Sequence, residues 1–313
     1  MDLGETTVPG GAADISIKSP EPAFSDMSEQ QFNMWADLLA ERTGMALPVQ
    51  RKSYLVTSLG LRMLEIGCES YDEYLEILNS GVTGEVEWNY LIDRLTVHET
   101  RFFRHPASLR LVDEYVQAKP VDNKTGTVTI HAWSAGCSTG EEAYSLAMTI
   151  DGALEARGHK SYFGVTATDI SLPSIKTGRE GVYSEWRIGK HVQPELLQKY
   201  FRPAPKGHYQ VIDELRRRVC FSPMNILDIK PQAIGLMDII ICQNLLIYFD
   251  REKRFEIINS MAEMLSPGGL MILGSGEIVG WVRPDIKKVN YPDALVYQRC
   301  NDSPGNSKHK VNV

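Results

Sequence analysis

A stretch near the middle of the chain, residues 128–142, combines a strand pattern, a glycine turn and two carboxylates. It reads VTIHAWSAGCSTGEE, with apolar and polar residues alternating over 128–132 and glycines at positions 136 and 140. The alternation predicts a strand, and the residues from Glu141 to Ile150 predict an amphipathic helix. A strand, a glycine turn and a helix N-terminus together present backbone N–H groups to a ligand. Glu141 and Glu142 would repel a phosphate, and the turn matches neither GxGxxG nor a P-loop. A ligand site of another kind and a plain structural turn both stay open.

Asp169 is a second candidate, because it ends the predicted strand Tyr162–Thr168. An acid at the carboxyl end of the second strand of a βαβ unit can accept hydrogen bonds from ribose hydroxyls. Its distance from Gly136 along the chain exceeds the roughly 20 residues of dinucleotide enzymes. The alternative is that Asp169 caps the following helix.

The segment 96–104, TVHETRFFR, mixes imidazole, carboxylate, guanidinium and aromatic side chains. Arg104 is its most informative group, because a guanidinium can hold a carboxylate through two parallel hydrogen bonds. The alternative is a linker between domains, in which Phe102 or Phe103 plugs an apolar surface and His98 is a structural hydrogen-bonding group.

These candidates must be positioned by an alternation of strands and helices. Further strand patterns cover Arg217–Phe221, Met237–Cys242 and Leu270–Leu273, and the second of these reads as a buried central strand. Helical spacing without strand patterns fills the chain from residue 28 to about 115. We therefore expect an α/β fold with a doubly wound, Rossmann-like sheet that binds its ligand across the strand carboxyl ends. The expected parts are a tail (1–26), an all-α domain with a linker (27–115), the sheet domain (116–300) with a small β insert (about 195–218), and a second tail (301–313).

The composition is that of an ordinary globular protein. Of 313 residues 43% are apolar and 23% charged, and 33 basic and 40 acidic residues give a net charge of -7. The acidic balance speaks against broad binding to nucleic acid or anionic membranes. Five cysteines without a CxxC pair favour a reducing compartment over a disulfide framework or a metal site. Neither a signal-peptide pattern nor an apolar run of about 18 residues is present. We expect a cytoplasmic monomer without membrane insertion.

Several stretches, taken together and in order, resemble the chemotaxis receptor glutamate O-methyltransferases, the CheR-type enzymes of bacterial signalling. The resemblance runs from about Phe32 to Gln298. It is carried by HETRFFR (98–104), WSAGCSTGEE (133–142), ATDIS (167–171), NIL (225–227), CQNLLIYFD (242–250) and PGGLMILGSGE (267–277). The number and order of these stretches make the resemblance far more specific than one glycine turn.

The resemblance implies an activity and a cofactor. Such enzymes use S-adenosylmethionine (SAM) to esterify glutamates on the coiled-coil signalling domains of chemoreceptors, releasing S-adenosylhomocysteine (SAH). The residues implied to hold SAM are His98, Thr100, Arg104, Glu141 or its neighbour Glu142, Asp169 at the ribose, Asn225 and Ile226 near the adenine, Gln243 and Asn244. Arg104 and Tyr248 are the catalytic candidates, which would orient a substrate carboxylate that is already ionised and needs no strong base. Tyr248 could equally be a packing aromatic at the foot of a helix.

The sequence departs from the family pattern at three places. The family usually has asparagine where His98 stands, arginine where Gln243 stands, and histidine-serine where Ser275 and Gly276 stand. These departures suggest a divergent branch, serving a pilus-linked or surface-sensing pathway. They also leave two alternatives open: a SAM-dependent methyltransferase acting on a small acid or RNA, and a non-catalytic SAM- or SAH-binding sensor or adaptor.

Two features bear on how a chemoreceptor is reached. Arg51 and Arg62 lie on one stripe of the second predicted helix, with Lys52 beside it, and this can be a solvated face or a docking face. Many family members bind a receptor's C-terminal pentapeptide at an edge strand of the insert, beside a glycine-rich loop. Here the matching stretch, Tyr200–Tyr209, has one glycine and two prolines, which remove backbone donors. We expect a pentapeptide-independent enzyme that contacts the receptor helical bundle through its N-terminal helical domain.

Overall fold

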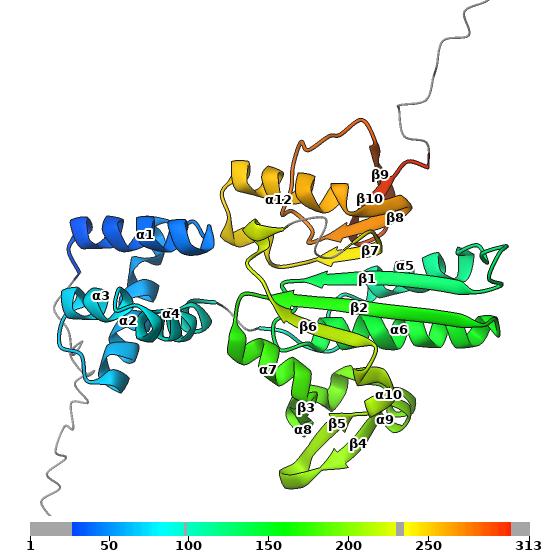
Figure 1. Ribbon diagram of the computed structural model, residues 1–313, viewed down its shortest axis with the longest axis horizontal. Helices are drawn as coiled ribbons and strands as arrows, with labels where there is room; N and C mark the ends of the chain where they lie inside the picture. Colours follow the sequence, from blue (N-terminus) through cyan, green and yellow to red (C-terminus); the bar gives the residue numbers. More distant parts are fainter. Residues whose placement is uncertain (1–26, 97–98, 230–234, 302–313) are drawn as a thin grey trace, which may run out of the picture.

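The computed structural model describes residues 27–96, 99–229 and 235–301. A helical domain at the amino end lies beside an α/β domain, here called the body, and a smaller lobe, residues 182–216, projects from the body (Figure 1). None of the described helices is long and apolar enough to cross a membrane.

The helical domain consists of α1 (Glu29–Thr43), η1 (Val49–Arg51), α2 (Lys52–Ile66), α3 (Tyr71–Leu78) and α4 (Val82–Leu95). A capping box starts α1, because the Ser28 hydroxyl accepts from the Gln31 N–H and the Gln31 side chain accepts from the Ser28 N–H. Trp35, Tyr74 and Leu91 are fully buried in a core cluster made by residues 27–95. The predicted helical domain therefore has its own core.

The body is built on a seven-stranded sheet in the order β6-β2-β1-β7-β8-β10-β9. Its strands are β1 (Val128–Ala135), β2 (Ser161–Asp169), β6 (Val219–Pro223), β7 (Met237–Cys242), β8 (Leu265–Leu273), β9 (Ile286–Tyr291) and β10 (Ala294–Arg299). Strands β6, β2, β1, β7 and β8 are parallel, and β10 and β9 complete the sheet in antiparallel pairs. The strand order reverses between β1 and β7, which opens a crevice at their carboxyl ends.

Helices cover both faces of this sheet. The helices α5 (Pro106–Ala118) and α6 (Glu141–Arg157) share a core cluster with one face, and α12 (Arg251–Glu263) shares a second cluster with the other. Strand β7 contributes side chains to both clusters: Ile239 and Ile241 belong to the first, and Ile240 and Cys242 belong to the second. A strand buried on both sides explains the continuous apolar run. The predicted doubly wound sheet is confirmed. The expected boundary at residue 115, however, divides α5, which packs against α6 and shares its core cluster with the sheet domain.

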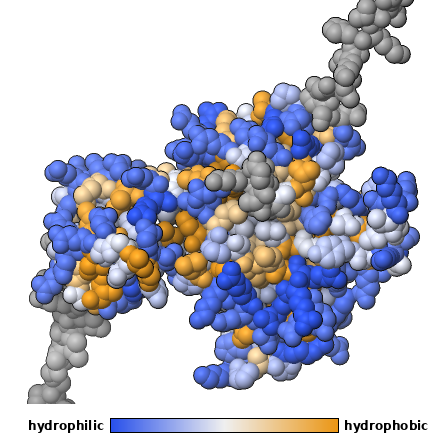
Figure 2. All heavy atoms as spheres, viewed as in Figure 1, coloured by the Kyte–Doolittle hydropathy of each residue, from blue (hydrophilic) through white to orange (hydrophobic). Residues whose placement is uncertain are grey.

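The lobe follows α7 (Leu172–Glu180) and contains a three-stranded antiparallel sheet in the order β3-β5-β4. Its elements are β3 (Val182–Ser184), α8 (Glu185–Ile188), η2 (Gly189–His191), α9 (Pro194–Tyr200), β4 (Phe201–Ala204), η3 (Pro205–Gly207), β5 (His208–Val211) and α10 (Asp213–Arg216). The lobe's sheet begins at Val182, earlier than the expected residue 195, because a strand as short as β3 has no readable alternation. Hydrophilic side chains dominate the lobe's surface in the view of Figure 2.

Candidate functional site

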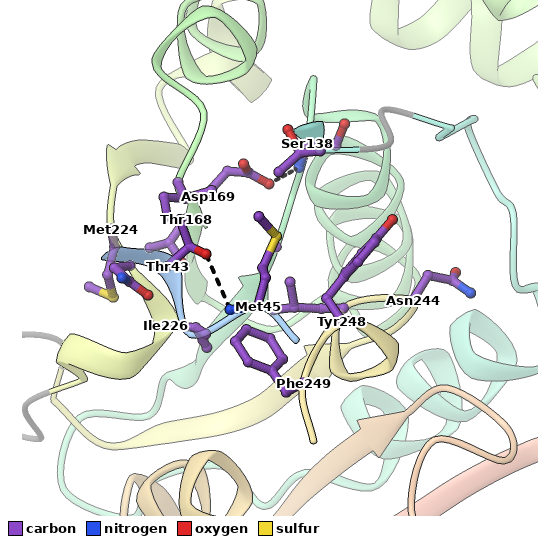
Figure 3. Close-up of a pocket in the computed structure, with 15 residues that line it drawn as sticks. Thr43, Met45, Ser138, Thr168, Asp169, Met224, Ile226, Asn244, Tyr248 and Phe249 are labelled. Atoms are coloured by element: carbon purple, nitrogen blue, oxygen red, sulfur yellow. Dashed lines mark hydrogen bonds between the residues drawn. The ribbon is translucent and has the colours of Figure 1, made fainter. Parts of the chain in front are cut away.

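A pocket lies where the helical domain meets the carboxyl ends of β1, β2 and β7 (Figure 3). Its empty volume is about 690 Å³. Asp169, Asn225, Ile226, Asn244 and Tyr248, all predicted site residues, line it. The structure thus brings five of the eleven predicted residues to one place, at the crevice expected for a doubly wound sheet.

The glycine turn after β1 shapes one wall of the pocket. Gly136 has a φ of 76°, and a Cβ there would stand 3.0 Å from the Leu245 side chain, so a larger residue would be strained and crowded. The N–H groups of Gly136 and Cys137 both donate to the Thr168 carbonyl, at 2.8 and 2.9 Å. The turn therefore binds the end of β1 to the end of β2, beside Asp169.

The Asp169 carboxylate is held by the backbone on both sides. One oxygen accepts from the Ser138 N–H at 2.8 Å and the other from the Ser171 N–H at 2.9 Å. Ser171 is the residue that caps α7, since its hydroxyl accepts from the Ser174 N–H. The capping alternative for Asp169 is therefore wrong. A carboxylate fixed at the pocket wall suits ribose hydroxyls, and that role stays a prediction.

Asn225 and Ile226 form another wall, at η4 (Ile226–Asp228). The Asn225 side-chain oxygen Oδ1 accepts from the Leu227 N–H at 3.1 Å, and the Asn225 side-chain amide donates to the Arg42 carbonyl at 3.1 Å. Ile226, Met224 and Phe249 add apolar surface (Figure 3). An apolar pocket with a few fixed polar groups suits a purine ring.

A smaller recess with an empty volume of about 250 Å³ contains a second group of predicted residues: Arg104, Glu142 and Gln243, together with His105. His105 Nε2 lies 2.9 Å from Asn244 Oδ1. Since Asn244 lines the main pocket and His105 lines the recess, this contact joins the two spaces. Of the described residues implied to hold SAM, Asp169, Asn225, Ile226 and Asn244 therefore line the main pocket, and Arg104, Glu142 and Gln243 line the recess.

Glu142 provides the carboxylate of the recess. The Ser134 hydroxyl donates to its carboxylate at 2.7 Å. Burial raises the pKa of the Glu142 carboxyl to about 7, against the opposing effects of the Ser134 hydrogen bond and the Arg104 charge, and the charge of Glu277 adds to the rise. A cationic ligand group, such as the amino group of SAM, would favour the ionised form.

Glu141 has a different environment. It is fully buried, and it accepts hydrogen bonds from the Thr139 hydroxyl and from the Arg187 guanidinium, both at 2.6 Å. This ion pair ties the start of α6 to the lobe at α8. Glu141 lines neither the pocket nor the recess, whereas Glu142 lines the recess. A contact of either carboxylate with the cofactor stays a prediction, and Glu142 has the more open position of the two.

Gln243 is satisfied within the protein. Its amide donates to the Ser108 hydroxyl at 3.0 Å and to the Leu273 carbonyl at 3.5 Å, and the side chain is buried. These bonds link the end of β7 to α5 and β8.

The segment before α5 is anchored by one aromatic side chain. Phe102 is buried and packs edge-on against Tyr183 at 5.0 Å and Phe201 at 5.5 Å between ring centroids. The predicted plug is thus Phe102, and it also fixes the lobe to the body. Thr100 and Arg104 line an outer groove beside Trp186, and neither lines the main pocket. His98 lies outside the described residues.

Tyr248 lies at the junction of the domains, at the end of η5 (Leu246–Tyr248). It lines the pocket, its carbonyl accepts from the Ala46 N–H at 2.8 Å, and the Arg51 guanidinium stands 5.8 Å from the centre of its ring. The packing and the functional interpretation of Tyr248 are both compatible with this position.

Three pocket residues of the helical domain were not predicted: Thr43, Met45 and Thr96. The Thr43 hydroxyl accepts from the Met45 N–H at 3.1 Å, which shapes the chain after α1 (Figure 3). Between them Gly44 has a φ of 74°, and a Cβ there would lie 2.4 Å from the Leu227 side chain. This glycine was the available signal, because it permits both the helix end and the close approach of the domains.

The stripe Arg51–Leu55–Ser58–Arg62 is not solvated along its length. Its middle residues, Leu55 and Ser58, are buried in the helical domain, whereas Arg51 at its start is exposed. Arg62 holds the buried Glu87 through two bonds, at 2.7 and 2.6 Å, and also pairs with Glu65 at 3.0 Å. Arg51 is exposed and Lys52 is half-buried. Among the described residues neither of them forms an ion pair with a carboxylate, in contrast to Arg62. Within the same residues, no group of three or more His, Cys, Asp or Glu side chains could hold a metal ion.

Comparison with known proteins gives the family. Residues 98–294 match the CheR methyltransferase, SAM binding domain, and residues 30–96 match the CheR methyltransferase, all-alpha domain. The chemotaxis protein methyltransferase of Vibrio parahaemolyticus serotype O3:K6 is 31% identical over 87% of this chain and 98% of that protein. That of Escherichia coli K12 is 31% identical over 87% and 92%, and chemotaxis protein methyltransferase 2 of Vibrio cholerae is 33% identical over 80% and 86%. The chain belongs to the CheR methyltransferase family, with an all-α domain followed by a SAM-binding domain.

Proposed function

We propose that this protein transfers the methyl group of SAM to glutamate side chains of a chemoreceptor signalling domain, giving glutamate methyl esters and SAH. Beyond family membership, one observation supports this. Arg104 lines both the recess that contains Glu142 and the outer groove. A guanidinium that faces both spaces can orient a carboxylate that enters from outside.

The residues of the pocket fit the cofactor. Asp169 would bind the ribose, the apolar wall at Ile226 and Phe249 the adenine, and Glu142 the amino group. SAM would supply a methyl group activated by its bond to a sulfonium. A carboxylate oxygen that attacks the methyl carbon would form the ester C–O bond as the C–S bond breaks, and SAH would leave as the neutral thioether. The substrate glutamate is ionised at neutral pH, so the protein needs to align it and exclude water rather than remove a proton. Arg104 and Tyr248 have this orienting role, since very tight binding by Arg104 would quench the carboxylate as a nucleophile.

Transfer of a radiolabelled methyl group from SAM to membranes carrying chemoreceptors tests the proposal. Esters hydrolyse in mild base, so the label should be released as volatile methanol. Label that enters RNA or a small acid instead would indicate another substrate. Absence of any transfer, with SAH binding intact, would favour a sensor or adaptor and reject the enzymatic proposal.

We also propose that the receptor bundle is reached through the helical domain, at Arg51 and Lys52. Both residues lie at the start of α2, and Arg51 contacts the pocket residue Tyr248. Arg51→Glu with Lys52→Glu should reduce methylation while SAH binding is kept. The matched control is Lys160→Glu with Lys288→Glu, because these lysines are exposed on β-sheet edges and loops away from the pocket. Equal loss in both double variants would contradict the assignment.

Two features of the lobe support the proposal that the enzyme works without binding a receptor's C-terminal pentapeptide. Strand β4 is one edge of its sheet, but Pro203 offers no N–H there, and the other edge strand, β3, has three residues. The turn between β4 and β5 has a single glycine, Gly207. Titration with a receptor's C-terminal pentapeptide should give no binding; micromolar binding to the lobe would refute this part of the proposal.

A further inference from the structure

An open groove separates the segment that carries Arg104 from the lobe. It has an empty volume of about 1090 Å³ and is bordered by Glu99 to Arg101 and Arg104 on one side, and by α8 and η2 on the other. Arg101, Arg104, Lys190 and His191 also border a neighbouring hollow that extends along α5. Arg101 and Arg104 reach the recess of Glu142 as well. The groove therefore leads from the protein surface to the proposed active site.

The charge of the groove is opposite to that of the whole protein. Its cationic residues are Arg101, Arg104, Arg187 and Lys190, and its acid is Glu99. The Arg187 charge is neutralised by the buried Glu141 at 2.6 Å. Arg101 and Lys190 are exposed and form no ion pair within the described ranges. A cationic surplus in a chain of net charge -7 is suited to attract an anionic partner.

An exposed tryptophan stands at the rim of this groove. The Trp186 side chain is 85% exposed, whereas the other four tryptophans, Trp35, Trp88, Trp133 and Trp281, are at most 6% exposed. Trp186 belongs to the short helix α8, whose end is anchored by the buried Ile188. An exposed aromatic side chain on a well-anchored helix, beside cations that have no partner, is typical of the anchor residues at protein interfaces.

We infer that this groove binds an acidic polypeptide segment of the substrate, the carboxylate-rich stretch flanking the glutamate that is methylated. The inference rests on the proposed function. Arg101 and Lys190 hold carboxylates of the segment, Trp186 covers its apolar side chains, and Arg104 receives the target glutamate. The groove favours a polypeptide over nucleic acid, because its two cations that are unpaired among the described residues, Arg101 and Lys190, are too few to neutralise a run of phosphates, and Trp186 can cover apolar side chains.

Trp186 supplies a local probe for the test. Acrylamide is neutral and quenches exposed tryptophans, so most of the quenchable fluorescence of the full chain should come from Trp186, and Trp186→Phe should remove it. An oligoglutamate peptide should protect Trp186 from quenching, less so at high salt. Arg101→Glu with Lys190→Glu should weaken this protection about tenfold or more. Lys160→Glu with Lys288→Glu should leave it unchanged.

SAH binding, measured by calorimetry on each variant, reports whether the cofactor site is intact. The inference is overturned if the peptide gives no protection while SAH binds and receptors are methylated. It is also overturned if a single-stranded oligonucleotide protects Trp186 better than the peptide. Protection by the peptide that is lost in Arg101→Glu with Lys190→Glu supports the groove even where no methyl transfer is found, and in that case the proposed function alone fails.

Discussion

Two carboxylates near the ends of the central strands, Asp169 and Glu142, are held by different partners and should respond differently to a ligand. Asp169 accepts from two backbone N–H groups, which hold both of its oxygens in place. Glu142 accepts from one hydroxyl, and burial raises the pKa of its carboxyl to about 7. Asp169 therefore offers fixed acceptor oxygens, whereas Glu142 should lose a proton when a cation binds.

Asp169→Ala should weaken SAH binding by about 1–3 kcal/mol, the scale for leaving buried polar partners unmet. The matched control is Asp122→Ala, because the Asp122 carboxylate also accepts from two backbone N–H groups, at 2.7 and 2.9 Å, in an exposed turn outside the pocket. Calorimetry with SAH measures both variants. An equal loss in the two would show that backbone support, and not ribose contact, is what Asp169 provides.

Glu142 predicts a pH dependence of cofactor binding. Below about pH 7 the carboxyl is mostly protonated in the free protein, and a ligand ammonium favours its ionised form. Binding then releases a proton, so SAH affinity should rise with pH, by up to about tenfold per unit, and level off above about pH 7. Glu142→Gln should bind more weakly at high pH and lose the slope. Calorimetry in buffers of different ionisation enthalpy detects the proton, and an unchanged slope in the variant would contradict the role of Glu142.

The raised pKa of Glu142 affects folding in the opposite direction: it lowers stability as the pH rises, whereas it increases cofactor affinity. In the unfolded chain the pKa of the Glu142 carboxyl is about 4.3, so between that pH and about pH 7 the native state binds more protons than the unfolded state. Without ligand, Glu142 therefore costs stability as the pH rises through this window. The Glu142→Gln variant should show a flatter decline of unfolding free energy with pH, which separates the effect on folding from that on binding.

Among the elements, the pair of α2 and α4 depends on one buried ion pair. Arg62 holds Glu87 by two hydrogen bonds, and the Tyr74 hydroxyl donates to Glu87 at 2.7 Å. Arg62→Met would leave the buried carboxylate without its cation and should cost about 3–5 kcal/mol of unfolding free energy, measured by urea denaturation. Arg51→Met, at the exposed start of α2, is the control and should cost far less.

Replacing both partners gives a sharper test. The double variant Arg62→Met with Glu87→Leu also removes the buried carboxylate that Arg62→Met leaves without a cation. It should recover much of the unfolding free energy lost in Arg62→Met, because apolar pairs of similar volume often replace buried ion pairs at little cost. If the double variant is no more stable than Arg62→Met, Glu87 has a role beyond this pair. Loss of methylation in an Arg62 variant therefore reports on folding before it reports on receptor docking.

The elements also show what a sequence reveals. The turn after β1, the buried run of β7 and the position of Asp169 follow from local pattern, because each depends on neighbours along the chain. Thr43 and Met45 join the pocket only through the packing of the domains, and β3 is a strand only through its pairing with β5. Leu55 and Ser58 share a stripe with two arginines, yet the neighbouring helices bury that stripe. Pattern predicts elements and strand-end sites, whereas contacts between distant segments decide the rest.

At the scale of the whole molecule, the pocket belongs to both domains. The Ala46 N–H donates to the Tyr248 carbonyl at 2.8 Å, the Asn225 amide donates to the Arg42 carbonyl at 3.1 Å, and the Ser171 hydroxyl donates to Asp93. Thr43, Met45 and Thr96 complete the pocket from the helical side. A ligand that fills this pocket touches both domains, so its binding energy stabilises their contact as well as the sheet domain.

This predicts the pattern of amide hydrogen exchange on SAH binding. At about one hundred times the dissociation constant the ligand contributes roughly 2.7 kcal/mol, so amides that exchange when the domains separate should slow by about a hundredfold. The Ala46 amide and its neighbours should therefore be protected together with the turn after β1, whereas α3, which contributes nothing to the pocket, should not change. Asp169→Ala, which should weaken SAH binding by about 1–3 kcal/mol, should reduce protection in both regions at matched SAH concentration. Protection confined to the sheet domain, with Ala46 unchanged, would show that SAH binds without engaging the helical domain.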